Sequence, residues 1–583
     1  MTLPRPRPLS SLSLTLAMSA ALLAACGGSD APETAAPAPA PAPSLPQLSA
    51  ATPATLAACT ALAGSFTFAS TTITAANVIA AGTLTNAGQP VAEHCQVTGR
   101  MNQRVSTVDG QTYAIGFEMR MPKDWNGRYL YQGNGGTDGA VAAATGNFVG
   151  GGPLQTALQM GFAVISSDAG HNGAQNPLFG LDPQARLDYG YKAVGTLTPM
   201  AKALIRAAYG KGPDRSYIGG TSNGGRHTMV AASRYAADYD GFLAISPGFN
   251  LPKAAVAQLY GAQRWAGIAT DLANLETALP IGERRLIANA ILAKCDALDG
   301  AADGLVQNVE GCATAFDLTR DVPTCSGARD GTCLTTAQKS ALADVFAGAR
   351  NSAGEALYAR WAYDPGIAST GWADWKFRNS VGAARDPVAV GFIFSSPPES
   401  ASLLSNTLGY ALNFSFDTGA PKIFATSGVY TESAMSFMTP PNPTVLQELR
   451  QRGAKMIVVH GAADGVFSIE DTTTWYKGLN TQWGGGAASF VRFFRVPGMG
   501  HSRGGPSTDQ FDAITALVNW VEKGQAPDRI VATARGAGNA GGVNAELPAD
   551  WSATRTRPLC PYPLIARYSG SGSVESAASF ECK

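Results

Sequence analysis

The chain has 583 residues and no formal net charge, because 43 Lys and Arg balance 43 Asp and Glu. A nucleic-acid-binding protein would need a surplus of basic side chains to neutralise phosphates, so we expect no nucleic-acid partner. Since 45% of the residues are hydrophobic and only 15% are charged, the composition also excludes a disordered chain.

The N-terminal region has the features of an export signal. Residues 1–26 combine a short basic start with an apolar stretch too short to span a bilayer, as in a signal peptide. The stretch ends in LLAAC, which resembles a bacterial lipobox and makes Cys26 the predicted lipidation site; the alternative is an ordinary secretory signal with a chance cysteine. Residues 27–50 are rich in Ala and Pro and predict a tether.

These features predict an exported protein, either an outer-membrane lipoprotein or a periplasmic or secreted protein of a bacterium. No later stretch reaches 18 apolar residues, so we expect membrane contact only through an N-terminal lipid anchor.

The cysteines are consistent with export. Without Cys26, eight of the nine cysteines remain, and in an oxidising compartment all of them can pair. None has the CxxC spacing of a zinc site. Although many pairings are formally open, proximity in the sequence favours Cys59–Cys95, Cys295–Cys312, Cys325–Cys333 and Cys560–Cys582.

Beyond the tether, short apolar runs alternate with helical patterns. Such alternation is typical of a mostly parallel sheet flanked by helices, an α/β architecture. We predict strands over residues 129–132, 162–166, 216–219, 242–245, 455–460 and 490–496, and helices over 186–209, 225–235 and 509–523, with Phe511 on the buried face of the last helix.

The alternation stops over residues 248–445. This stretch contains four cysteines, an acidic turn and three tryptophans. We interpret it as an inserted lid domain over the carboxyl edge of the sheet, where open α/β sheets bind ligands. The catalytic core is then formed by residues 51–247 and 446–583.

Residues 220–224 (GTSNG) fit the pattern G-x-S-x-G between a predicted strand and a predicted helix. In this context the glycines permit a sharp turn that exposes a serine hydroxyl, so Ser222 is the candidate nucleophile. The alternative is a glycine-rich β–α turn without a catalytic role.

A nucleophilic serine needs a histidine base and a carboxylate that orients the base. In the hydrolase fold these follow the serine in the order acid, then histidine. Asp464 and His501 follow two late predicted strands in that order. His227 lies inside the helix after the serine, and we interpret His460 as a packing residue at a strand end.

The oxyanion of the intermediate needs two backbone N–H donors. We expect one from Asn223, directly after the serine, and the other from Asn134 in the glycine-rich turn after an early strand. The alternative for Asn134 is a merely flexible turn. His171 also follows a strand, but we favour a structural hydrogen bond for it over a role in the pocket.

The chain resembles the tannase and feruloyl esterase family of α/β-hydrolases from about residue 58 to residue 582. The resemblance rests on the segments FGLDPQARLD (179–188) and RPLCPYP (557–563) and on the acidic turn that begins at Cys295. It implies the α/β-hydrolase fold with a large lid, the triad Ser222, Asp464 and His501, and hydrolysis of esters of aromatic acids.

The acidic turn CDALDGAADGL (295–305) resembles the calcium site in the lid of this family. The resemblance implies a structural Ca²⁺ held by carboxylates and backbone carbonyls, and we expect no organic cofactor. The alternative is a solvated acidic turn. The implied ligands are Asp296, Asp299 and Asp303, with the carbonyl groups of Ala301 and Leu305.

The chain departs from the family at two positions. The family joins a cysteine before the nucleophile to a cysteine after the histidine, but here Thr221 and Ser502 stand at those positions. For the substrate, the resemblance implies aromatic contacts from Phe467 and Trp375. Arg385 is the candidate for binding a substrate carboxylate; the alternative is a surface arginine.

The sequence thus predicts an exported serine esterase that acts through an acyl-enzyme on small aromatic esters, of terephthalic, ferulic or gallic acid. Two other classes share parts of the pattern. A serine peptidase or amidase has the same triad, and a surface-anchored binding lipoprotein with a hydrolase fold would have no activity.

Overall fold

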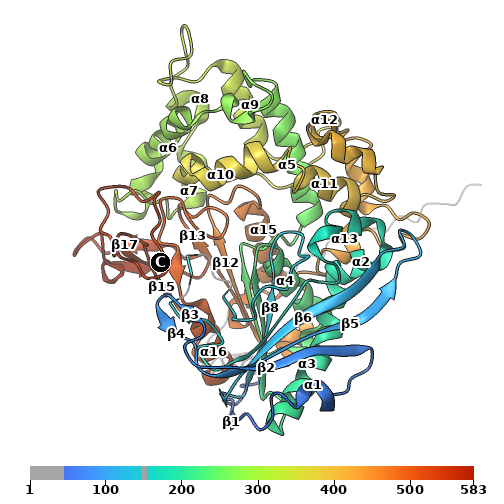
Figure 1. Ribbon diagram of the computed structural model, residues 1–583. Coiled ribbons are helices and arrows are strands. Elements are labelled where there is room, and N and C mark those ends of the chain that lie inside the picture. Colours follow the sequence, from blue (N-terminus) through green and yellow to red (C-terminus); the bar gives the residue numbers. More distant parts are fainter. Residues whose placement is uncertain (1–44, 148–150, 153) are drawn as a thin grey trace, which may run out of the picture. The chain divides into compact units, whose positions relative to one another are not determined.

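Nine strands form the central sheet of the computed structural model, which describes residues 45–583 except 148–150 and 153 (Figure 1). The predicted signal peptide, Cys26 and most of the tether lie outside these residues. Leu45–Lys583 form one compact unit. Within the described part, no helix is long and apolar enough to cross a bilayer.

Six neighbouring strands of the sheet are parallel, and every strand predicted from the sequence is among them. Their bounds differ from the predicted ones by one or two residues. In sheet order they are β13 (Val491–Val496), β12 (Lys455–Gly461), β11 (Gly241–Ile245), β10 (Arg215–Thr221), β8 (Arg128–Gly133) and β9 (Ala163–Ser167).

Three long antiparallel strands that the sequence analysis did not predict complete the sheet beyond β9. They come early in the chain, and a short turn joins β5 to β6, as is possible between antiparallel strands. In sheet order they are β6 (Thr112–Pro122), β5 (His94–Val105) and β2 (Thr71–Ile79). The sheet is therefore mixed, and together with its flanking helices it has the expected α/β-hydrolase fold.

Helices cover both faces of the parallel strands. Along β8, Tyr129 and Tyr131 pack into one apolar cluster and Leu130 into another, because successive side chains of a strand point to opposite faces. The first cluster contains side chains of α3 (Ala193–Tyr209), α4 (Asn223–Arg234) and α15 (Ile469–Gln482), and the second contains those of α16 (Ala513–Lys523).

Helix α16 begins at Ala513, four residues later than the predicted helix over residues 509–523. Asp512 caps it by accepting a hydrogen bond from the Thr515 N–H at 2.9 Å. Phe511, expected on the buried face of the helix, instead lies in the short strand β14 (Gln510–Phe511), which pairs with β15 (Ile530–Thr533). The period of apolar residues could not show where the cap falls.

Residues 246–454, called the insert here, separate two strands that are direct neighbours. β11 and β12 pair in parallel, with Ile245 opposite Val459. The helices of the insert gather beyond one end of the sheet (Figure 1). They share an apolar cluster of their own, to which α5 (Leu251–Ala266), α6 (Ile281–Cys295) and α9 (Thr336–Phe346) contribute.

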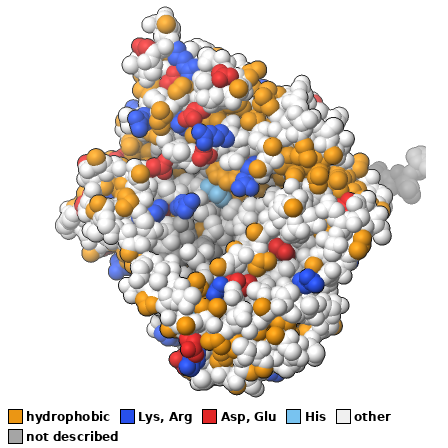
Figure 2. Space-filling view, viewed as in Figure 1, with side chains coloured by type: hydrophobic (Ala, Val, Ile, Leu, Met, Phe, Trp, Pro, Cys, Tyr) orange, Lys and Arg blue, Asp and Glu red, His pale blue; other side chains and the backbone are white. Residues whose placement is uncertain are grey.

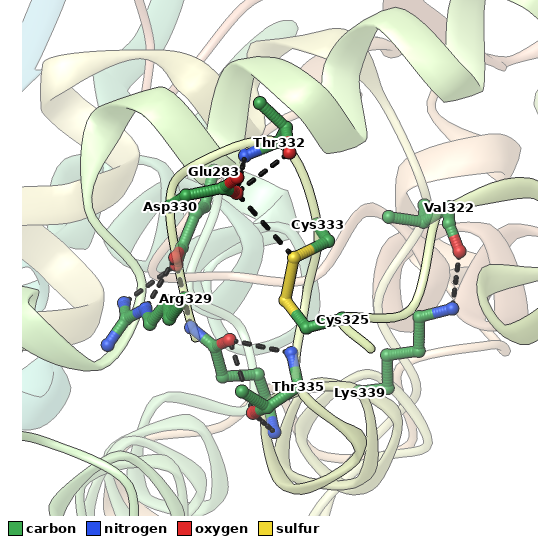
Figure 3. The surroundings of a disulfide bond; sticks show 10 residues. Glu283, Val322, Cys325, Arg329, Asp330, Thr332, Cys333, Thr335 and Lys339 are labelled. Carbon is green, nitrogen blue, oxygen red and sulfur yellow. Dashed lines mark hydrogen bonds and ion pairs between the residues drawn. A yellow bond between two sulfur atoms is a disulfide. The ribbon is translucent and has the colours of Figure 1, made fainter. Parts of the chain in front are cut away.

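All four expected disulfide pairs are present: Cys59–Cys95, Cys295–Cys312, Cys325–Cys333 and Cys560–Cys582. Figure 3 shows the third pair, which closes the loop before α9. Just beyond it Thr335 caps α9 in a capping box with Gln338. The disulfide thus fastens an irregular part of the insert next to a well-defined helix start.

Candidate active site

Ser222 lies at the turn between β10 and α4. Its backbone conformation (φ 63°, ψ −122°) is uncommon for a residue other than glycine. The turn packs tightly on the end of β8. A Cβ atom added to Gly224 would come 2.2 Å from the carbonyl oxygen of Gly133, and one added to Gly220 would come 2.6 Å from it. Glycines at these positions therefore permit the strained turn that the sequence predicted.

The three residues of the predicted triad form a continuous chain of hydrogen bonds. Ser222 Oγ lies 2.8 Å from His501 Nε2, and His501 Nδ1 lies 2.8 Å from Asp464 Oδ2. Asp464 follows β12, and His501 follows β13. Because parallel strands end at the same edge of a sheet, residues far apart in sequence meet here.

Asp464 is buried and accepts four hydrogen bonds. Oδ1 accepts the N–H groups of Val466 at 2.9 Å and Phe467 at 3.0 Å. Oδ2 accepts from His501 and also lies 3.2 Å from His460 Nε2. Burial alone would raise the pKa of Asp464, but the two histidines outweigh it and hold the pKa below its usual value.

The sequence predicts that His460 is only a packing residue. In the structure it also contacts the carboxylate of Asp464. It is fully buried, and its Nδ1 lies 2.9 Å from Thr472 Oγ1 in α15. A Thr472 hydroxyl that donates to Nδ1 leaves Nε2–H facing Asp464. The spacing of four residues between His460 and Asp464, across a strand end, was the available signal.

The two expected oxyanion-hole residues have fixed side chains. Asn134 donates from Nδ2 to Ser166 Oγ at 2.9 Å and to the Ser167 carbonyl at 2.8 Å. Asn223 is the first residue of α4, and Asn134 lines the same cleft as Ser222. A Cβ atom on Gly135 would come 4.0 Å from Ser222 Cβ, so this loop passes directly over the serine.

The buried carboxyl group of Asp138, which the sequence analysis did not identify, connects the loop of Asn134 to helix α4. Asp138, four residues after Asn134, accepts from Asn223 Nδ2 at 2.8 Å and lies 2.9 Å from His227 Nε2. Burial raises the pKa of Asp138 to about 7. No sequence motif marks this residue, because its partners come from a different element.

His171 makes the structural contact expected for it. Its Nε2 lies 3.2 Å from Asn176 Oδ1, and its ring stacks on Phe179 with centroids 3.6 Å apart. It is not among the described residues that line the cleft.

The nucleophile opens into a cleft of about 390 Å³. Trp375 and Arg385 of the insert line it, with the Trp375 ring 5.3 Å from the His501 ring and the Arg385 guanidinium 6.0 Å from Trp375. Phe467 is not among the described lining residues; it packs against His501 at 5.3 Å from behind the cleft wall. Figure 2 shows a hollow with a histidine at its floor.

Thr221 and Ser502, which replace the cysteines of the family, also line this cleft. Ser502 is buried and has a positive φ of 70°. No disulfide therefore links the loop of the nucleophile to the loop of the base.

The acidic turn of the insert has some of the features that a cation site needs. Asp299 is buried, and its Oδ2 has no hydrogen-bond partner. Burial raises its pKa to about 7, assisted by the neighbouring Asp303 and Asp296. Asp303, however, is paired with Arg557, and in the described residues no three acidic, His or Cys side chains are grouped closely enough to hold a metal.

The chain is similar to known proteins of one family. A family model described as tannase and feruloyl esterase matches residues 95–583. The chain belongs to the tannase and feruloyl esterase family. The mono(2-hydroxyethyl) terephthalate hydrolase of Piscinibacter sakaiensis is 41% identical to it, over 84% of this chain and 85% of that one.

Other members are more distant. Feruloyl esterase C of Talaromyces stipitatus is 26% identical over 80% of this chain and 82% of its own. The crystal structure of feruloyl esterase B from Aspergillus oryzae matches at a TM-score of 0.71 and 22% identity, over 90% of this chain and 99% of that one. Fold and family agree, and this member of the tannase and feruloyl esterase family is a carboxylic ester hydrolase.

Proposed function

We propose that the protein is a serine esterase that hydrolyses esters of aromatic carboxylic acids through an acyl-enzyme. The observation that carries the proposal is the hydrogen-bonded chain from Ser222 through His501 to Asp464, which opens into a cleft lined in part by Trp375. A serine, a base and a buried carboxylate in this order are the groups that acyl transfer requires.

The reaction follows from the geometry. His501 Nε2 takes the proton of Ser222 Oγ as the oxygen attacks the ester carbonyl, and Asp464 stabilises the imidazolium that forms. The N–H groups of Asn223 and Asn134 are the proposed donors to the oxyanion. His501 then protonates the leaving alcohol, and water, activated by the same histidine, hydrolyses the acyl-enzyme.

The cleft favours an aromatic acid that carries its own carboxylate. Trp375 offers a ring face next to His501, and Arg385 lies close to that ring. A terephthalate monoester has both an aromatic ring and an acid-side carboxylate, as in the substrate named for the Piscinibacter relative. Feruloyl and galloyl esters have the ring but not that carboxylate, which makes them the comparison substrates.

We propose also that the acidic turn binds a structural Ca²⁺ and that the protein is exported and lipidated at Cys26. The buried, unpartnered Oδ2 of Asp299 supports the first proposal, because a cation would be the partner that this oxygen lacks and would offset the repulsion from Asp296 and Asp303. Four disulfides support the second, because they persist in oxidising compartments.

The test is a panel of esters with the wild-type protein and the variant Ser222→Ala. We expect hydrolysis of a terephthalate monoester, methyl ferulate or methyl gallate, and covalent labelling of Ser222 by a fluorophosphonate. Ser222→Ala should lose both while keeping the melting temperature, because the glycines of the turn remain. Turnover by Ser222→Ala near the wild-type rate would refute the serine mechanism.

A further inference from the structure

The catalytic cleft contains two guanidinium groups and no carboxylate. Arg385 comes from the insert, directly before the short helix α11 (Asp386–Val388), and Arg503 comes from the loop after β13. Both line the cleft beside Ser222, and among its described lining residues there is no Asp or Glu. Figure 2 shows Lys or Arg side chains on both sides of the hollow. In a chain without net charge, the cleft is thus locally positive.

The guanidinium of Arg503 is not paired with any acidic side chain of the described residues. The side chain is exposed and has no ion pair or hydrogen bond within the described residues. The acidic residues near its loop are engaged elsewhere. Glu546 accepts the N–H groups of Gly505 and Thr370, both at 2.6 Å, and Asp509 is paired with Arg535 at 2.7 Å.

The charge of Arg385 also remains free. The only hydrogen bond of its side chain within the described part of the chain runs to the Ala384 carbonyl at 3.3 Å. The adjacent Asp386 is buried, and burial raises its pKa to about 8 against the opposing effect of Arg385 and Lys376, which disfavours a compensating negative charge at neutral pH.

The two arginines lie next to different parts of the reaction. Arg503 is two residues after His501, the group that must protonate the leaving alcohol. Its loop is fixed, because the Gly504 N–H donates to Asp509 Oδ2 at 2.8 Å. Arg385 instead lies over the oxyanion loop: its NH1 is 3.5 Å from the position that a Cβ atom of Gly136 would take. Arg503 thus belongs to the loop of the base, and Arg385 lies against the loop proposed to bind the oxyanion.

We propose that Arg503 is an anion-binding subsite for the alcohol part of the substrate, so that the preferred substrates are esters of aromatic acids with a carboxylate-bearing alcohol or phenol. The inference deepens the proposed function and rests on it. A guanidinium binds a carboxylate by charge-assisted hydrogen bonds, and a partly enclosed cleft screens that attraction less than open solvent does. With Arg385 on the acid part, the best substrate has an anionic group at each end.

The experiment uses two matched phenyl esters of one aromatic acid. One has 3-hydroxybenzoate as its alcohol part, and the other has 3-hydroxybenzamide, which is similar in shape but uncharged. The measured quantity is the ratio of kcat/KM for the carboxylate ester to kcat/KM for the amide ester. Because both esters are measured with the same protein, any general effect of a variant on turnover or folding cancels in this ratio.

We expect wild-type protein to favour the carboxylate ester and Arg503→Gln to lower the ratio about three- to tenfold, between the values for exposed and for desolvated charge pairs. Arg503→Lys should keep most of the ratio because it retains the charge. Arg100→Gln, which removes an exposed arginine of β5 that does not line the cleft, is the matched control and should leave the ratio at its wild-type value.

Arg385→Gln separates the two ends of the substrate. It should act on an acid-side carboxylate, tested with terephthalate against benzoate as the acid part, and the double variant should show additive effects because the two charges contact different groups. Raising the ionic strength should lower the ratio in wild-type protein but much less in Arg503→Gln.

Three results would overturn the inference. The first is an equal ratio for wild-type protein and Arg503→Gln. The second is that Arg503→Gln changes the preference for terephthalate over benzoate as the acid part but not the preference for 3-hydroxybenzoate over 3-hydroxybenzamide as the alcohol part. The third is that neither phenyl ester is hydrolysed although the terephthalate monoester is, which refutes the inference and leaves the proposed function standing. Hydrolysis of both esters with an unchanged ratio refutes only the role of Arg503.

Discussion

Two buried carboxyl groups of this protein, Asp464 in the core and Asp299 in the insert, have opposite properties. Asp464 accepts hydrogen bonds from two histidines and two backbone N–H groups, and its pKa is held low. Asp299 has one oxygen without a partner and two acidic neighbours, and its pKa is raised to about 7. Similar burial thus accompanies a lowered pKa in one place and a raised pKa in the other.

The difference shows that the partners of a buried carboxyl group decide its charge. At Asp464 the protein itself supplies donors, so the negative charge is ready to stabilise a protonated His501. At Asp299 the protein supplies too few donors and adds like charges, and an external cation is the natural complement. The first group is placed to take part in the proposed reaction, and the second is where the proposed Ca²⁺ would stabilise the insert.

The strongest way to break this comparison is to remove the charge of Asp464. Asp464→Asn keeps the size of the side chain, but its amide favours the wrong tautomer of His501, so we expect kcat to fall about ten-thousandfold. KM should change far less. Steady-state kinetics with a terephthalate monoester measures the effect, and a loss of less than about tenfold would show that Asp464 is not the partner of the base.

Removing calcium tests the other side of the comparison. Suppose that Ca²⁺ binds only the folded insert and that free Ca²⁺ is present at a hundred times its dissociation constant. Chelation should then lower the free energy of unfolding by about 3 kcal/mol. Differential scanning calorimetry with EGTA and with added Ca²⁺ measures this shift. Asp299→Asn should abolish the response to Ca²⁺, whereas Asp344→Asn, at an exposed acid of the same insert, should not.

The pH dependence of that response has a definite sign. Because the pKa of Asp299 is raised to about 7 in the folded chain, the folded protein keeps a proton that the unfolded chain releases above about pH 4. This group therefore adds stability at low pH that is lost as the pH rises from about 4 to 7. Ca²⁺ must displace the proton, so the gain in melting temperature should be larger at pH 8 than at pH 5.5. An equal gain at both values would exclude Asp299 as a ligand.

The smallest expected effect comes from taking one donor away from Asp464. His460→Ala should lower kcat about tenfold, the value of one hydrogen bond to a charged group, with little change in KM. His460→Gln retains an N–H donor and should recover most of the loss. Titration of active sites with a fluorophosphonate corrects for unfolded protein. If Gln and Ala lower kcat per active site equally, His460 only fills space.

The sequence predicted that Ser222, Asp464 and His501 meet, because order along the chain and position at strand ends are properties of single elements. It could not identify His460 or Asp138 as partners of the site, since their contacts join elements that only the folded sheet brings together. The antiparallel strands β2, β5 and β6 were missed for a related reason. Their more buried side chains alternate with more exposed ones along much of each strand, so they do not form the continuous apolar runs by which the parallel strands were predicted.

The position of the insert has a consequence for how the chain is made. Because β11 and β12 are direct neighbours in the sheet but lie about two hundred residues apart in sequence, β11 emerges during synthesis long before its partner. Until β12 arrives, the buried parallel sheet has an open, apolar edge, which is prone to wrong pairing. Pairing across such a distance also closes a very long loop. The insert, with its own apolar cluster and two of the four disulfides, can organise in the meantime and shorten that loop.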